Sequence, residues 1–258
     1  MNFPIRYFRS VLASNDKPCD PANRPNHRAN RALRAVPVAL LCLLAACGRP
    51  MTQTEIAFSQ GLHGDTLDTG RVRLVRGALV GSVTFMRKPR PRETCRERIL
   101  PPAKEEMVTV SPAAVALFNR IFFTHDWYLD DYLTGYPDQL HIVEAMLLAH
   151  ELTHAWQWQN REVTGYHPLR AAAEHQSSDD PYLFDVETSA DFLSYGYEQQ
   201  GTIVEEYVCC RALAPEAPRT ERLHGMLARV FDISDLPKAR ESDVYLPWSG
   251  AELKGICG

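Results

Sequence analysis

Two histidines with a glutamate between them offer the clearest chemistry in the sequence. They stand in the segment His150-Glu151-Leu152-Thr153-His154, an H-E-x-x-H motif. Residues four apart on a helix lie one turn apart on the same face, so both imidazoles can reach one metal ion. Zinc suits such ligands, and a site with three protein ligands keeps a position open for water. Glu151 lies beside the pair, where it can accept a proton from that water.

A buried helix carrying two hydrogen-bonded histidines without a metal is the alternative interpretation of this motif. The apolar run of residues 145–149 leads directly into His150. Such a run predicts a helix that is buried on the side that must stay dry around a catalytic metal. The run therefore favours a metal site.

A third ligand must come from elsewhere in the chain, and two downstream glutamates are candidates. Glu187 and Glu198 follow His154 by 33 and 44 residues, distances at which a second helix could pack against the first. Asp191 follows Glu187 by four residues, a spacing that would let the aspartate hydrogen-bond a ligand histidine. Glu198 has Thr202 at the same position. From the residues alone, both glutamates stay open as the third ligand.

The elements that must position these side chains follow from the spacing of apolar residues. Apolar residues at helical spacing predict helices over residues 113–122, 137–160, 192–212 and 220–231. Alternating polar and β-branched residues predict strands over residues 71–75, 80–86 and 107–110. We therefore expect an α+β fold, mainly helical, with a small antiparallel sheet.

The first part of the chain has the pattern of a bacterial export signal. Basic residues at 28–34 precede twelve apolar residues at 35–46. Twelve residues at ~1.5 Å each cover about 18 Å of a ~30 Å bilayer core, which argues against a permanent spanning helix. The segment Leu44-Ala45-Ala46-Cys47 resembles the lipobox of lipoproteins, which implies lipidation of Cys47. We expect a leader over residues 1–46, with an ordinary signal peptide as the alternative, and a single domain over residues 47–258.

The net charge of the domain differs from that of the whole chain. The chain carries a formal charge of −4, but residues 1–46 hold seven basic and two acidic residues. The remaining residues hold 21 basic and 30 acidic residues, a net charge of −9. Such an acidic domain argues against nucleic acid as a partner and against attachment to anionic lipid through basic patches.

Four cysteines remain in the domain beyond Cys47: Cys95, Cys209, Cys210 and Cys257. An even number in an exported protein predicts two disulfides. A bond between the neighbours Cys209 and Cys210 would be strained, so we expect Cys95 to pair with one of them and Cys257 with the other. The alternative, a second metal site, lacks the paired C-x-x-C spacing.

The motif with a downstream glutamate resembles the gluzincin group of zinc metallopeptidases. More narrowly, most of residues 51–210 resemble small bacterial "vgr-related" proteins, kin to a zinc-peptidase-like domain found near secretion and toxin systems. The blocks that carry this resemblance are residues 51–56, 64–73, 150–159 and 192–207. The resemblance implies a zincin-like fold, zinc as the cofactor, and Glu198 as the third ligand.

These observations predict a zinc metallopeptidase of the cell envelope, lipid-anchored on the periplasmic face of the outer membrane. Its partners would be a peptide or protein substrate and components of an envelope secretion system. Residues 107–110 could dock the peptide as an edge strand. Candidates to stabilise the carbonyl oxygen during hydrolysis are Tyr166, His167, His175 and Tyr195. Two alternatives are a catalytically silent zinc-binding assembly module and a zinc hydrolase of another amide, such as cell-wall peptide.

Overall fold

The computed structural model describes residues 48–77, 84–233 and 244–258. The predicted leader, the lipidation site Cys47 and residues 80–83 of one predicted strand lie outside the described residues. No helix in the three described segments is long and apolar enough to cross a bilayer.

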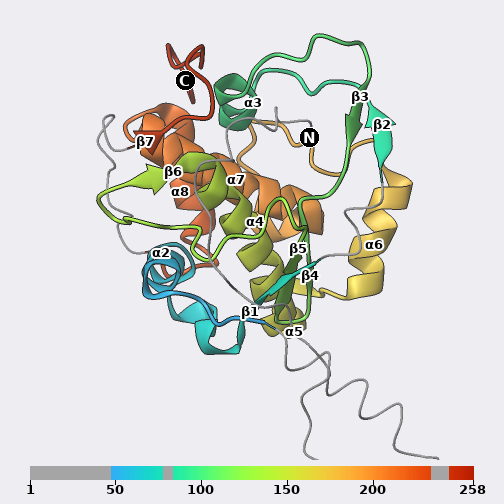
Figure 1. The fold of residues 1–258 in the computed structure, drawn as a ribbon, viewed down its shortest axis with the longest axis vertical. Coiled ribbons are helices and arrows are strands. Elements are labelled where there is room, and N and C mark those ends of the chain that lie inside the picture. The colour runs from blue at the N-terminus through green and yellow to red at the C-terminus, as the bar shows by residue number, and fades with distance from the viewer. Residues whose placement is uncertain (1–47, 78–83, 234–243) are drawn as a thin grey trace, which may run out of the picture.

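Two helices cross at the centre of the molecule, α4 (Ile142–Gln159) and α7 (Tyr197–Leu213) (Figure 1). Both are buried over most of their length. Helix α4 carries apolar or small side chains on nearly every face, a pattern typical of a buried helix. Helix α4 begins five residues later than the predicted helix. Residues 140–141 instead form strand β6 (Leu140–His141), which pairs with the distant β7 (Val244–Tyr245), a pairing that local periodicity does not reveal.

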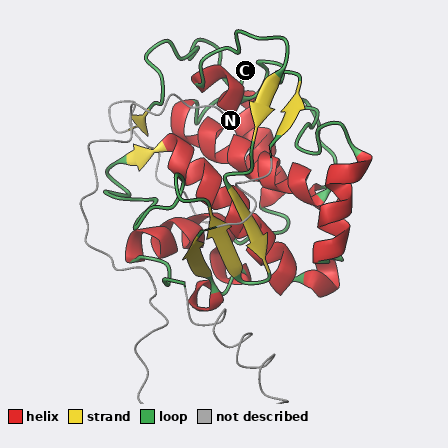
Figure 2. Ribbon diagram, turned by 45° about the vertical axis from the view of Figure 1, so that its right-hand side comes forward, coloured by secondary structure: helices red, strands yellow, loops and turns green. Residues whose placement is uncertain are grey.

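A three-stranded sheet packs against α4 (Figure 2). Its order is β1 (Arg73–Arg76), β5 (Arg120–Phe123) and β4 (Ala114–Leu117). Strand β1 runs parallel to β5, and β4 runs antiparallel to it. This sheet is thus mixed, and of the predicted strands it contains only the one at residues 71–75. The predicted antiparallel pairing is found in a second sheet, between residues 85–87 and 108–110.

The prediction of a helix over residues 113–122 is wrong, because this segment forms the β4–β5 hairpin. Phe118 has a φ of 60° at the turn, which ends any regular element there. Val115 pairs with Phe122 across the two strands. Such β-branched and aromatic residues favour strands, but a nearly continuous apolar run does not distinguish a strand from a helix by its period.

The remaining elements surround this centre. A second sheet pairs β2 (Phe85–Arg87) with β3 (Val108–Val110) in antiparallel fashion. The shorter helices are α2 (Gln53–His63), α3 (Cys95–Ile99), α5 (Arg161–Thr164), α6 (Pro168–Ser177) and α8 (Pro218–Leu227). The predicted helix over 192–212 corresponds to a 3-10 turn (Phe192–Ser194) followed by α7, and that over 220–231 corresponds to α8. The fold is α+β, as predicted.

Two disulfides fix α7 to distant parts of the chain. Cys209 is bonded to Cys95 on α3, and Cys210 is bonded to Cys257 near the C-terminus. The pairing expected from the sequence is confirmed. With all four sulfurs in disulfides, they are not thiolate ligands for a second metal ion.

The buried His63 makes the stability of this fold depend on pH. Burial lowers the pKa of His63 to about 3, against 6.5 for an unfolded histidine. The unfolded chain therefore binds one more proton than the folded chain between pH 6.5 and 3, and stability falls as the pH falls through this range. The limiting slope for one group is about 1.4 kcal/mol per pH unit.

We expect His63→Gln to remove this part of the acid sensitivity, because the glutamine does not ionise. The measurement is urea unfolding of the metal-free wild type and variant between pH 7 and 4. Parallel stability curves for the two proteins over that range would contradict the prediction.

Candidate metal centre

Helix α4 brings the two motif histidines together on the face that meets α7. The Nε2 atoms of His150 and His154 lie 3.1 Å apart, as the four-residue spacing predicted. Both residues are buried, at 5% and 6% exposed. Two imidazole nitrogens thus point at one small volume inside the protein.

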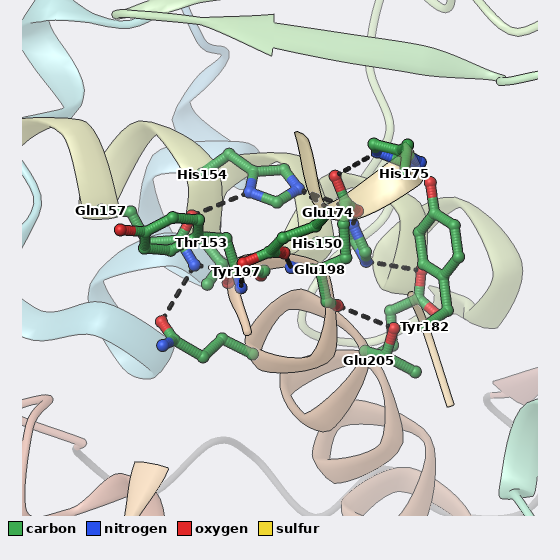
Figure 3. Close-up of polar contacts among 12 residues, drawn as sticks. His150, Thr153, His154, Gln157, Glu174, His175, Tyr182, Tyr197, Glu198 and Glu205 are labelled. Carbon is green, nitrogen blue, oxygen red and sulfur yellow. Dashed lines mark hydrogen bonds and ion pairs between the residues drawn. The ribbon is translucent and has the colours of Figure 1, made fainter. Parts of the chain in front are cut away.

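The carboxylate of Glu198, in the first turn of α7, meets this pair of nitrogens (Figure 3). Its Oε2 lies 3.2 Å from His150 Nε2 and 3.4 Å from His154 Nε2. One ligand atom from each of the three residues lies within 4.8 Å of the other two. This is the donor set of two imidazoles and a carboxylate that zinc prefers.

Contacts on the far side of each ring hold the two imidazoles in orientation. His154 Nδ1 hydrogen-bonds Gln157 Oε1 at 2.9 Å, and the Gln157 amide nitrogen donates to Gln200 Oε1. His150 Nδ1 lies 3.2 Å from Glu205 Oε1. The Gln157 oxygen favours a proton on Nδ1 of His154, and the negative charge of Glu205, at ion-pair distance but outside hydrogen-bond geometry, favours one on Nδ1 of His150. Each Nε2 then keeps its lone pair. Two lone pairs and a carboxylate oxygen facing one another at this distance fit a bound cation.

Glu151 supplies a fourth feature of the site. Its side chain is buried, with the residue 6% exposed, and its Oε2 has no hydrogen-bond partner among the described residues. Buried carboxylate oxygens are nearly always hydrogen-bonded, so this oxygen needs a partner that the described residues do not supply. A water molecule held at the site would supply one.

Burial and close charges set the protonation of these groups without a metal. Burial raises the pKa of Glu151 most, and the nearby carboxylates add to this effect while the two histidines oppose it. For His150, burial opposes the charged form, but the carboxylates of Glu198 and Glu205 outweigh it and raise the pKa to about 10. Burial also opposes ionisation of Glu198, yet His154 and His150 hold its pKa well below the usual range. The carboxylates of the site therefore stabilise positive charge between them. A metal ion would supply this charge in place of protons.

Gly201 allows the two helices to approach closely enough for this geometry. It lies on α7, three residues after Glu198 and on the same face. A Cβ atom at this position would lie 2.7 Å from Cε1 of the His150 ring. The glycine is unfavourable in a helix interior by about 1 kcal/mol, so its presence is explained by contact with His150.

Glu187, the other third-ligand candidate, does not join the two histidines. Its side chain is 65% exposed and forms ion pairs with Arg219 and Arg222 at 3.6 Å and 3.2 Å. Asp191, which would have supported it, pairs with Arg229 at 2.9 Å.

Of the four candidates for stabilising a carbonyl oxygen, two lie beside the three converging side chains and two make contacts elsewhere. The Tyr166 ring lies 6.4 Å from the His154 ring, and His175 Nε2 lies 3.0 Å from Glu198 Oε1. His167 instead caps α6, and Tyr195 hydrogen-bonds Thr188.

Several residues at the site were not predicted from the sequence, among them Glu205, Gln157 and Tyr182. Glu205 follows Glu198 by seven residues, and Gln157 follows His154 by three. Helical spacing places each of them on the face of its partner, so this signal could have found both. Tyr182, whose ring lies 5.8 Å from the His150 ring, comes from a loop and has no such signal.

Comparisons with known proteins give one relative in sequence. No protein-family model matches the chain. The chain is 25% identical over 188 residues to the type VI secretion system spike protein VgrG2b of Pseudomonas aeruginosa, a match covering 71% of this chain. The chain is similar in sequence to part of a secretion-system spike protein. The match spans only 15% of that relative's length. Among solved structures, the effector domain of Pseudomonas aeruginosa VgrG2b matches with a TM-score of 0.47 and 24% identity, covering 76% of this chain and 93% of that domain.

Gly201→Ala tests the close approach of α4 and α7. The new methyl group would push the His150 ring from its position, so we expect zinc affinity to fall at least about tenfold and stability to fall by about 1–3 kcal/mol. Gly225→Ala on α8 is the matched control, because a Cβ there meets nothing within 4 Å and alanine favours the helix. Urea unfolding and zinc competition titrations measure both effects. Equal behaviour of the two variants would show that the glycine does not set the site.

Proposed function

We propose that this protein is a zinc-dependent hydrolase of peptide bonds. The observation that carries the proposal is the convergence of His150 Nε2, His154 Nε2 and Glu198 Oε2 on one buried point. The Oε2 of Glu151, which has no partner among the residues that the structure describes, supports catalysis in particular, because a purely structural metal site has no use for a buried proton acceptor.

In this proposal, three residues bind the metal and a fourth transfers protons. His150, His154 and Glu198 would hold the zinc, which as a Lewis acid polarises a carbonyl group and makes hydroxide available at neutral pH. Glu151 accepts the proton of the attacking water and delivers it to the leaving amine.

Two tyrosines are suited to donate a hydrogen bond to the carbonyl oxygen. Burial raises the pKa of the phenols of Tyr166 and Tyr182, so both stay protonated at neutral pH. Their rings lie against those of His154 and His150 respectively. Either phenol could stabilise negative charge that develops on the substrate.

An extended peptide would dock on strand β4. This strand lies at one edge of its sheet and packs against α4, the helix that carries the motif. Val115 and Leu117 are 38% and 41% exposed on it. Strand β3, which includes most of the predicted docking segment at residues 107–110, belongs to the other sheet with β2. We therefore propose β4 as the edge for peptide addition.

The second candidate function is a catalytically silent, zinc-binding module of a secretion system. The similarity to the VgrG2b spike protein favours it, because that relative is named for its place in a secretion apparatus. Either function is compatible with anchoring through Cys47 at the periplasmic face of the outer membrane and with secretion-system components as partners. The Glu151 side chain favours the hydrolase.

Metal analysis combined with peptide-library digestion tests the proposal. The protein is purified from the cell envelope with its disulfides intact, as wild type, Glu151→Gln and the control Glu162→Gln, which changes an exposed carboxylate on α5. We expect one zinc per chain in all three, and cleavage reduced at least about 100-fold in Glu151→Gln alone. Zinc without cleavage in every protein would favour the silent module. Absence of zinc from the wild type would overturn both functions.

A further inference from the structure

The second oxygen of the Glu198 carboxylate has a partner of its own. Oε2 faces His150 and His154, whereas Oε1 lies 3.0 Å from Nε2 of His175. Glu198 is buried, at 8% exposed, so an Oε1 without a donor would be costly. His175 belongs to α6, outside the two central helices.

Glu174, the residue before His175, hydrogen-bonds the backbone of Glu198. The Glu174 carboxylate accepts hydrogen bonds from the backbone N–H groups of Tyr197 at 2.9 Å and Glu198 at 3.2 Å. These N–H groups lie in the first turn of α7 and have no acceptor within the helix. A carboxylate there therefore stabilises the start of the helix. A Cβ at Gly196 would lie 3.2 Å from Glu174 Oε1, and the glycine thus leaves room for this carboxylate.

Two neighbours on α6 therefore fix one residue of α7 in two ways, through its backbone and through its carboxylate (Figure 3). We propose that His175 is a positioning residue, which holds Oε1 of Glu198 so that only Oε2 is presented to the metal. The inference rests on the proposed function and assigns α6 the task of shaping its metal site. Single-oxygen ligation would preserve the open position that hydrolysis needs.

His175 acts through the carboxylate and not as a ligand. The group of ligand atoms within 4.8 Å of one another comprises those of His150, His154 and Glu198, without His175. Its side chain is 41% exposed, whereas that of His150 is 7% exposed. A residue at the rim of the site is also accessible to small molecules, which makes chemical rescue feasible.

Removal of His175 should weaken the metal site without removing a ligand. Without its donor, Glu198 is free to turn or to bind through both oxygens, and loss of such an outer contact typically costs 10–100-fold in metal affinity. His175→Gln keeps an N–H donor and should retain more of the affinity than His175→Ala. Gln176→Ala, at the next and exposed position of α6, is the control.

The experiment measures the zinc dissociation constant of the exported, disulfide-bonded protein by competition with a chromogenic chelator. We expect His175→Ala to bind zinc about 10–100-fold more weakly than wild type. Imidazole added to His175→Ala should restore part of the affinity, and Gln176→Ala should match wild type. Visible spectra of the Co²⁺-loaded proteins should show the same number of nitrogen ligands in wild type and His175→Ala.

The other possible results show whether the inference alone fails or the proposed function fails with it. Wild-type zinc affinity in His175→Ala would overturn the positioning role and leave the function standing. Loss of a nitrogen ligand from the Co²⁺ spectrum would also overturn it, because His175 would then bind the metal directly. Failure of wild type to bind zinc would overturn both. If His175→Ala does not fold, as judged by circular dichroism, His175→Leu takes its place, because it fills similar space without a donor, and wild-type zinc affinity in that variant would overturn the inference.

Discussion

The close packing of α4 against α7 is the constraint on which the site depends. His150 rests against Gly201, where even a methyl group would lie 2.7 Å from its ring. This contact brings His150 Nε2 within 3.2 Å of the Glu198 carboxylate. Neither helix carries a complete donor set, since α4 supplies both imidazoles and α7 supplies the acid. The site therefore exists only while the two helices keep this separation.

The rest of the fold holds α7 along its length. At its beginning, Glu174 of α6 caps the helix backbone. Near its end, the Cys95–Cys209 and Cys210–Cys257 disulfides connect it to α3 and to the C-terminal segment. Between these points, Glu205 lies 3.2 Å from Arg96 of α3 and 3.2 Å from His150. A carboxylate shared in this way couples the covalently fixed α3 to the orientation of His150, a proposed zinc ligand.

Local spacing predicted the part of the site that one helix carries, and failed where the contact is tertiary. His150 and His154 follow from the four-residue spacing of the motif. Spacing alone left both Glu187 and Glu198 as candidates for the third ligand, and only a family resemblance favoured Glu198. The helix over residues 113–122 was wrong because a continuous apolar run has no distinct period. The contact of His175 with Glu198 depends on how α6 folds back onto α7, and no local pattern encodes it.

X-ray absorption at the zinc edge of the purified, zinc-loaded protein tests the proposed metal centre most directly. The geometry predicts a zinc ion with two imidazole nitrogens and low-mass oxygen ligands at about 2.0–2.1 Å, with no sulfur. Glu198→Gln should weaken this centre, whereas Glu187→Gln, at a carboxylate that is 65% exposed, should leave its spectrum unchanged. Sulfur ligands at about 2.3 Å, or a spectrum that changes with Glu187→Gln and not with Glu198→Gln, would contradict the site described above.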